Sequence, residues 1–414
     1  MNQVILTLIQ QLKKQPIFHL SLADKELFHS NFLAWLALEY PTFFLSVLEG
    51  MKTQEGTKVN TAGWRKDYLQ NKLTVKREYN NFDLCILREV QKKKGIVLEP
   101  VFILENKNKS IPYLSQLQNY NEKLKQYKPE RLLLSLATHI PDRKNITNAG
   151  WKIVSYGDLA EAMRNVPKSI KPYPKALIKD YQKFVSNLAE LSDKLLRIKS
   201  YFIDDKVLQE LAECRMDDLA QKIRYSSFAA ELSTNTVVSR KIVIADSREM
   251  KDNAKYPPGT VYVGQDYTSR GGATGIIQLA VKLHENYALK IQVQGEHYRH
   301  ALEWLGTGAS CTKETMTQLL NSKDIKAFFE EDAFEEKELF EDGFYPVKQD
   351  GNDCDGEEQE EKKAKIYGYN HFGLGFQYRS KKLLKNQELT YQKLLSHMIN
   401  DLSLFLGSPA QVRG

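Results

Sequence analysis

Three residues between positions 83 and 107 have the types and the spacing of a site that does chemistry. Asp83 lies inside the apolar run 82–89, where a carboxylate is unfavourable unless it is paired or coordinated. Glu105 ends the apolar run 100–105, and Lys107 follows two residues later. Alternate side chains of an extended chain point to the same face, so Glu105 and Lys107 share a face. If the two runs are neighbouring strands, Asp83 approaches this pair.

The chemistry that this set indicates is hydrolysis of a phosphodiester bond. Two carboxylates and a nearby backbone carbonyl form the oxygen-rich pocket that Mg2+ prefers. A bound Mg2+ holds the scissile phosphate and acidifies a water molecule, while Lys107 orients that water or stabilises charge on the phosphorus. The competing interpretation is a salt bridge at the end of a strand, because a Glu-x-Lys pair occurs in many proteins. An Asp inside the preceding strand and a helix directly after the pair favour the site.

Hydrophobic periodicity predicts the elements that position these residues. The run 100–105 is continuously apolar, which is typical of a central strand buried on both faces. Asn80 and Asn81 predict a tight turn before Asp83. The expected elements are a helix over 24–48, strands over 72–78, 82–89 and 100–105, a helix over 110–127, strands over 131–138 and 151–156, and a helix over 157–164.

These elements and motifs resemble the PD-(D/E)XK nuclease superfamily, whose core is a helix, a hairpin, a third strand, a helix and a fourth strand. The matching motif is Phe82-Asp83 followed by Glu105-Asn106-Lys107, with Phe82 where the superfamily has Pro. The resemblance covers residues 20 to 165 and is greatest to poorly characterised bacterial families. It implies an α/β, restriction-endonuclease-like core, a mixed central sheet flanked by helices. It also implies a metal-dependent nuclease that uses Mg2+, with Mn2+ as a substitute.

The resemblance extends to residues on the two neighbouring helices. Gln116 and Tyr120 are similar to the QxxxY element of RecB-like members, and at i and i+4 they point the same way, toward a phosphate or Lys107. The alternative is an ordinary amphipathic surface pair. Glu26 matches the first-helix carboxylate that completes the metal site with Asp83 and Glu105 in some families. Its alternative is a helix N-terminal carboxylate favoured by the macrodipole, and His29 is interpreted as a packing or capping residue.

The function expected is therefore a magnesium-dependent nuclease acting in restriction, repair or defence. We expect DNA rather than RNA as the substrate, because members of the superfamily that this sequence resembles usually cleave DNA. The rival hypothesis is a catalytically silent nucleic-acid-binding or regulatory module on a nuclease-like fold. Degenerate members lose a residue of the triad, and here all three are present. A third hypothesis is a toxin or defence factor whose activity a partner controls through the C-terminal domain. Such a protein would still be a nuclease.

The chain is too long for one core, and its organisation predicts three parts. A nuclease-like domain over 1–170 is followed by a helical bridge over 175–232 and an α+β domain over 235–414. Within the last domain, residues 330–361 are expected to be an acidic mobile insertion. His297 and His300, three apart on an expected helix, lack a third metal ligand and are interpreted as part of a solvated face.

Charge is distributed unevenly along the chain. The net charge is +7, but residues 330–361 hold 15 Asp or Glu against two lysines, so the remainder carries +20. A basic body suits phosphate binding, although lysine-rich surfaces also occur in proteins without such a partner. The proposed binding rim consists of Lys92, Lys93, Lys94, Lys107 and Lys109.

The remaining features limit compartment and partners. The first 18 residues lack a signal-peptide pattern, and no run of about 18 apolar residues predicts a membrane span. Four scattered cysteines without a CxxC motif fit a reducing cytoplasm and argue against a zinc cage. A cytoplasmic protein without a membrane partner is expected. The C-terminal domain is the expected contact for a homodimer or a regulatory protein.

Overall fold

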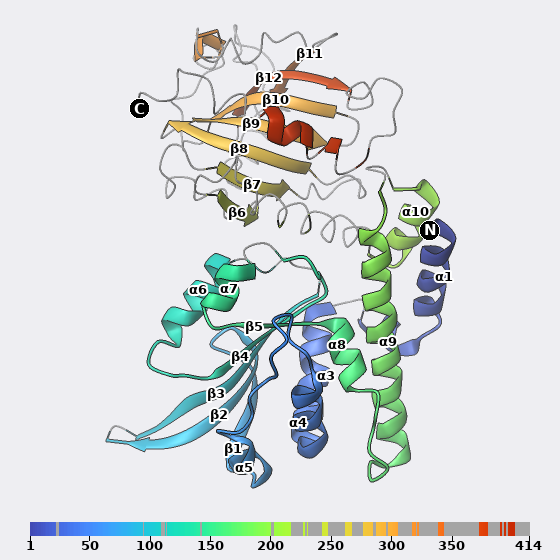
Figure 1. The fold of residues 1–414 in the computed structure, drawn as a ribbon, viewed down its shortest axis with the longest axis vertical. Helices are drawn as coiled ribbons and strands as arrows, with labels where there is room; N and C mark the ends of the chain where they lie inside the picture. The colour runs from blue at the N-terminus through green and yellow to red at the C-terminus, as the bar shows by residue number, and fades with distance from the viewer. Residues whose placement is uncertain are drawn as a thin grey trace, which may run out of the picture. The chain divides into compact units, whose positions relative to one another are not determined.

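A computed structural model of the chain consists of two compact units, residues 1–198 with 203–231 and residues 199–202 with 232–414 (Figure 1). The residues that it describes are 1–21, 25–93, 95–108, 112, 114–140, 143–199, 203–216, 227, 230, 242–246, 261–266, 276–284, 287–294, 297–304, 317–319, 321–322, 338–342, 372–379, 390, 393–394 and 396–401.

The first unit is built on a five-stranded mixed sheet in the order β1-β2-β3-β4-β5. The first three strands are antiparallel, and β4 and β5 continue the sheet in parallel. The α/β class and the mixed sheet flanked by helices are confirmed. The strands are β1 (Leu73–Tyr79), β2 (Phe82–Lys92), β3 (Gly95–Lys107), β4 (Glu130–Ser135) and β5 (Lys152–Ser155).

The turn between β1 and β2 fixes the register at the site end of β2. Asn80 and Asn81 adopt positive φ angles of 56° and 70°, which Asn tolerates better than most residues. Tyr79 therefore pairs with Phe82 across a two-residue turn, as the Asn-Asn sequence predicts. Asp83 follows at once, so its position on the sheet is set by this turn.

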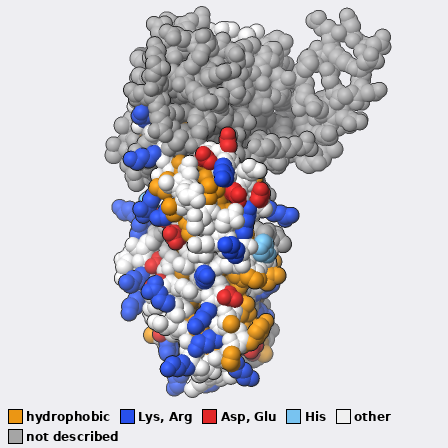
Figure 2. Space-filling model, turned by 90° about the vertical axis from the view of Figure 1, so that its right-hand side faces the viewer, with side chains coloured by type: hydrophobic (Ala, Val, Ile, Leu, Met, Phe, Trp, Pro, Cys, Tyr) orange, Lys and Arg blue, Asp and Glu red, His pale blue; other side chains and the backbone are white. Residues whose placement is uncertain are grey.

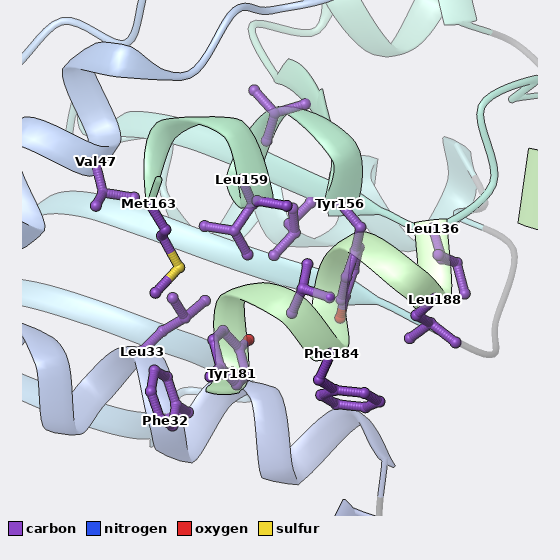
Figure 3. Packing of buried hydrophobic residues seen from close by; sticks show 14 of the residues in the cluster. Phe32, Leu33, Val47, Leu136, Tyr156, Leu159, Met163, Tyr181, Phe184 and Leu188 are labelled. Carbon is purple, nitrogen blue, oxygen red and sulfur yellow. The ribbon is translucent and has the colours of Figure 1, made fainter. Parts of the chain in front are cut away.

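Helices cover both faces of this sheet (Figure 1). On one face, apolar side chains from the sheet pack with α3, α4, α8 and α9, and Figure 3 shows Tyr156, Tyr181 and Phe184 in this cluster. On the other face, Cys85 and Ile103 pack with residues of α6 and α7. The helices are α1 (Asn2–Lys13), α2 (Pro16–Ser21), α3 (Lys25–Glu39), α4 (Pro41–Gly50), α5 (Arg65–Leu69), α6 (Leu114–Lys123), α7 (Arg143–Asn148), α8 (Tyr156–Ala162), α9 (Pro172–Leu196) and α10 (Asp205–Glu213).

Three helical features differ from the sequence expectation. The single helix expected over 24–48 is two helices, because Pro41 stands at the first position of α4. Helices α1 and α2 were not expected, since Gln and Lys interrupt their apolar residues. Helix α9 lies mostly within the expected bridge over 175–232, yet its buried side chains belong to the core of the first unit.

The second unit has its own seven-stranded sheet, in the order β11-β12-β10-β9-β8-β7-β6. His297 and His300 lie on strand β10 and not on a helix, because β10 pairs with both β9 and β12. Part of the acidic stretch 330–361 is also regular, since Glu338–Asp342 pair with β12; its other residues lie outside the described part. The strands are β6 (Ile242–Asp246), β7 (Val261–Asp266), β8 (Ile276–His284), β9 (Tyr287–Gln294), β10 (His297–Trp304), β11 (Glu338–Asp342) and β12 (Phe372–Arg379).

Within the part of the chain that the structure describes, no helix combines the length and apolar character needed to cross a membrane.

Candidate active site

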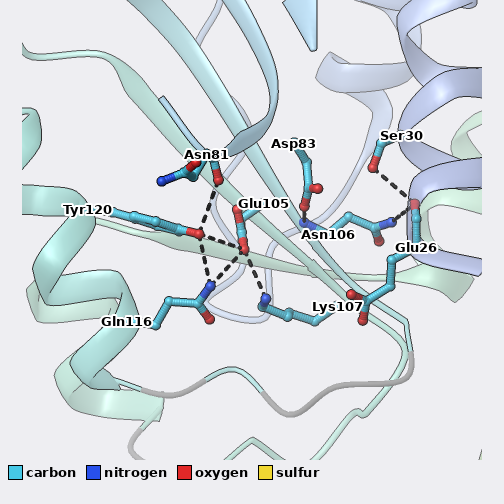
Figure 4. Close-up of polar contacts among 9 residues, drawn as sticks. All are labelled: Glu26, Ser30, Asn81, Asp83, Glu105, Asn106, Lys107, Gln116 and Tyr120. Carbon is cyan, nitrogen blue, oxygen red and sulfur yellow. Dashed lines mark hydrogen bonds and ion pairs between the residues drawn. The ribbon is translucent and has the colours of Figure 1, made fainter. Parts of the chain in front are cut away.

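The register of β2 and β3 brings Asp83 and Glu105 to the same place on the sheet. Leu84 pairs with Leu104 in this antiparallel ladder, so one further step sets Asp83 opposite Glu105. Residues opposite one another in such a ladder point to the same face. The carboxylate of Asp83 accepts a hydrogen bond from the backbone N–H of Asn106, with 2.7 Å between Oδ2 and N (Figure 4). Asp83 is thus fixed beside the end of β3.

Glu105 lies at the centre of the cluster, with 3% of its surface exposed. Its Oε1 atom is 2.9 Å from the ammonium of Lys107. The same oxygen accepts hydrogen bonds from Gln116 Nε2 at 3.3 Å and from Tyr120 OH at 3.4 Å. Its Oε2 atom is buried and has no hydrogen-bond partner among the described residues. One oxygen of Glu105 is thus saturated, and the other is left for a donor or a cation.

Lys107 is buried at the end of β3, with 8% of its surface exposed. Burial alone lowers the pKa of a lysine, but the negative charges of Glu105 and Glu26 outweigh it and raise the pKa of Lys107. The side chain therefore stays charged inside the fold. Because its side chain is buried, Lys107 is not part of the exposed basic rim that the sequence predicts.

Repulsion and burial act together on the two carboxylates. Burial first, and then the charge of Glu105, raise the pKa of Asp83 to about 7, although the N–H of Asn106 opposes this. Burial also raises the pKa of Glu105 against the opposing charge of Lys107. The ionised forms of two such neighbouring carboxyl groups repel each other, and a bound cation would stabilise both.

Gln116 and Tyr120 of α6 point at Glu105. Besides its bond to Glu105, Gln116 donates to Tyr120 OH at 2.9 Å, and Tyr120 also donates to the carbonyl of Asn81 at 3.2 Å. Figure 4 shows the side chains of Gln116 and Tyr120 converging on the Glu105 oxygen that Lys107 also contacts. Both side chains therefore lie against the Glu105 carboxylate, on the oxygen that also contacts Lys107.

Glu26 stands in the first turn of α3 and is half-buried. Its negative charge adds to the rise in pKa of all three residues of the cluster, less than burial does for Asp83 and Glu105 and less than the charge of Glu105 does for Lys107. His29, one turn on, packs inside: its Nδ1 lies 2.8 Å from Tyr181 OH, and its ring stacks on Phe184. His29 is therefore a packing residue, which is one of the two roles that the sequence indicated for it.

The donors at this site suit a hard divalent cation. They are carboxylate oxygens, and Glu105 Oε2 is a buried acceptor without a described partner. Among the described residues, however, no group of three or more His, Cys, Asp and Glu side chains has the arrangement of a ready-made metal site. Asp83 and Glu105 would hold the cation, and Glu26 would complete its surroundings.

Sequence reasoning missed Asn106. This residue is fully buried; its backbone N–H bonds to Asp83, and its side-chain amide bonds to the carbonyl of Glu26 and to Tyr156 OH. The signal in the sequence is a polar amide between Glu105 and Lys107, directly after the strand expected over 100–105.

The expected basic rim is partly present. Lys93 is exposed, while Lys92 forms an ion pair with Glu99 at 2.8 Å; Lys94 and Lys109 lie outside the described residues. Residues 1–198 carry 31 Lys or Arg against 19 Asp or Glu, a net charge of +12. Figure 2 shows basic side chains spread over the visible face of this unit among fewer acidic ones.

No family model, curated protein or solved structure matches this chain.

Proposed function

We propose that the first unit is a magnesium-dependent nuclease that hydrolyses phosphodiester bonds, with DNA as the expected substrate. The observation that carries the proposal is one cluster: Asp83 and Glu105 on one face at the end of β3, with the buried ammonium of Lys107 2.9 Å from Glu105. The order of elements from α3 to β5 supports a restriction-endonuclease-like core. The net charge of +12 over residues 1–198 supports a phosphate-bearing partner.

Each side chain has a task in this proposal. Mg2+, when bound, supplies positive charge to the scissile phosphate and increases the acidity of water. Asp83 and Glu105 hold the cation with carboxylate oxygens. Lys107 holds a positive charge where the attacking water and the phosphate meet, which favours the transition state over the substrate. Gln116 and Tyr120 keep Glu105 oriented through its Oε1 atom.

Cleavage of linear and supercoiled DNA by the purified full chain tests the proposal. We expect cleavage with Mg2+ or Mn2+ and none with a chelator, and we expect Glu105→Gln to abolish it. Glu130→Gln is the matched control, because Glu130 is a carboxylate of the next strand that pairs with Lys152 at 2.5 Å, away from the cluster. Loss of cleavage in Glu105→Gln alone supports the proposal. DNA binding without cleavage under any metal would favour the silent binding module instead.

A further inference from the structure

Asn106 joins the site to the helices on the opposite face of the sheet. The backbone N–H of Asn106 donates to Asp83 Oδ2 at 2.7 Å. Its side-chain Nδ2 donates to the backbone carbonyl of Glu26 at 3.0 Å, and its Oδ1 accepts from Tyr156 OH at 2.5 Å. The residue is fully buried, so none of these bonds competes with solvent.

The position of Asn106 in the strand explains this double role. Glu105 and Lys107 point to the face that α6 covers, so the side chain between them points to the face that α3 and α8 cover. The backbone of one residue therefore holds Asp83, while its amide holds the first turn of α3. Figure 4 shows Asn106 between Asp83 and Glu26.

We propose that Asn106 is a positioning residue of the cation site, whose amide fixes the first turn of α3 and thereby sets Glu26 beside Asp83 and Glu105. This inference rests on the proposed function. Tyr156 orients this amide. Its hydroxyl donates to Oδ1 of Asn106, so that Nδ2 points toward the carbonyl of Glu26. Without these hydrogen bonds the Glu26 carboxylate is no longer held near Asp83 and Glu105. The negative charge around a bound cation then decreases, and the cation binds more weakly.

The test measures binding of Mn2+ alone, through the metal-dependent rise in melting temperature of the full chain. Loss of a residue that orients metal ligands typically weakens metal binding by about 10-fold. We expect Asn106→Leu and Tyr156→Phe each to require about 10-fold more Mn2+ for the same rise. Tyr156→Phe removes one hydroxyl only and decides the matter if Asn106→Leu does not fold.

Tyr181→Phe is the matched control. Tyr181 is also fully buried, and its hydroxyl bonds to His29 and not to Asn106. We expect this variant to lose stability as Tyr156→Phe does, but to keep the Mn2+ response of the unaltered protein. A general loosening of the core would change the two variants alike and would overturn the proposal.

A double variant tests whether Asn106 acts through Glu26. Combined with Glu26→Gln, Asn106→Leu should add little further loss of Mn2+ binding, because the charge that it positions is already gone. Additive losses would overturn the route through Glu26. An unaltered protein that does not respond to Mn2+ would reject the proposed function itself. An unaltered response in both Asn106→Leu and Tyr156→Phe would reject this inference alone.

Discussion

The Asp83 carboxyl combines burial with a close like charge, and this combination makes its ionisation unfavourable. Its pKa is raised from 3.8 to about 7. Between these two pH values, Asp83 is therefore protonated in the folded protein and ionised in the unfolded chain. Stability contributed by the protonated group is present below pH 4 and is lost as the pH rises through 7. In metal-free protein, Asp83→Asn should therefore be more stable than the unaltered chain at pH 8, by on the order of 2 kcal/mol.

Thermal unfolding at pH 8 and pH 4.5 in a chelator measures this prediction. The stabilisation should be clearly smaller at the lower pH, where folded Asp83 is protonated and only the ionisation of the unfolded chain still favours unfolding. Asp67→Asn serves as the control, since Asp67 is more exposed and pairs with Arg88 at 2.9 Å. A gain in stability that does not depend on pH would contradict the assignment of Asp83 as a carboxyl strained by its surroundings.

Lys107 carries the positive charge that the proposed reaction uses. Lys107→Met keeps the apolar part of the side chain but removes the ammonium. We expect cleavage to fall by about 100-fold or more, as on removal of a transition-state donor, while Mn2+ binding persists. Single-turnover cleavage at saturating Mn2+ measures the rate apart from binding. A rate within a few-fold of the unaltered protein would remove Lys107 from the chemistry.

We expect Gln116 to have a smaller role in the proposed reaction than the charged residues. Its bond to Glu105 is 3.3 Å long and goes to an oxygen that Lys107 also holds. We expect Gln116→Ala to slow cleavage by about 10-fold or less, because one long hydrogen bond contributes only about 1 kcal/mol. The concentration of Mn2+ giving the half-maximal rate should stay nearly unchanged, because Lys107 and Tyr120 still hold the same oxygen of Glu105. A large shift in that concentration would instead make Gln116 a contributor to metal binding.

For individual residues, the sequence predicts those positions that strand alternation and turn geometry determine. The alternation of side chains put Glu105 and Lys107 on one face, and the Asn-Asn turn set Asp83 opposite them. Asn106 could not be recognised in this way. Its role depends on α3 and α8, whose distances from β3 no spacing in the sequence reveals.

Elements were predictable where one face is buried and turn residues mark the ends. All five strands of the first sheet were expected from their apolar patterns. Strand β10 was not, because its polar sequence His297–Trp304 lies between two neighbours in the sheet and is stabilised by pairing with both. Helix α9 was expected as a helix, but its packing partners on the sheet could not be read from its period alone.

Helix α10 offers a prediction that separates stability from activity. Asp204 stands at its N-cap and accepts hydrogen bonds from the N–H groups of Lys206 and Val207. Asp204→Ala should lower stability by about 1 kcal/mol, the usual effect of losing such a cap. Denaturant unfolding measures the loss, and cleavage at 25 °C should be unchanged. Reduced cleavage with intact folding would show that α10 influences the site.

For the whole molecule, the distribution of charge predicts how the proposed binding of nucleic acid depends on the acidic residues of the chain. Residues 1–198 carry +12, whereas the entire chain carries only +7, largely because residues 330–361 carry −13. Acidic residues in the same chain compete with phosphate for basic side chains. Neutralising the Asp and Glu residues of 350–361 to Asn and Gln leaves strand β11 untouched and keeps the chain length.

We expect this neutralised chain to bind DNA more tightly, by about 10-fold at 50 mM salt, with the difference shrinking at 200 mM as ions screen the charges. Fluorescence anisotropy with a labelled duplex at several salt concentrations measures the effect. A chain with residues 350–361 in scrambled order keeps the charge and should bind as the unaltered protein does. If the neutralised and unaltered chains bind equally at every salt concentration, the acidic stretch does not compete with nucleic acid for the basic first unit.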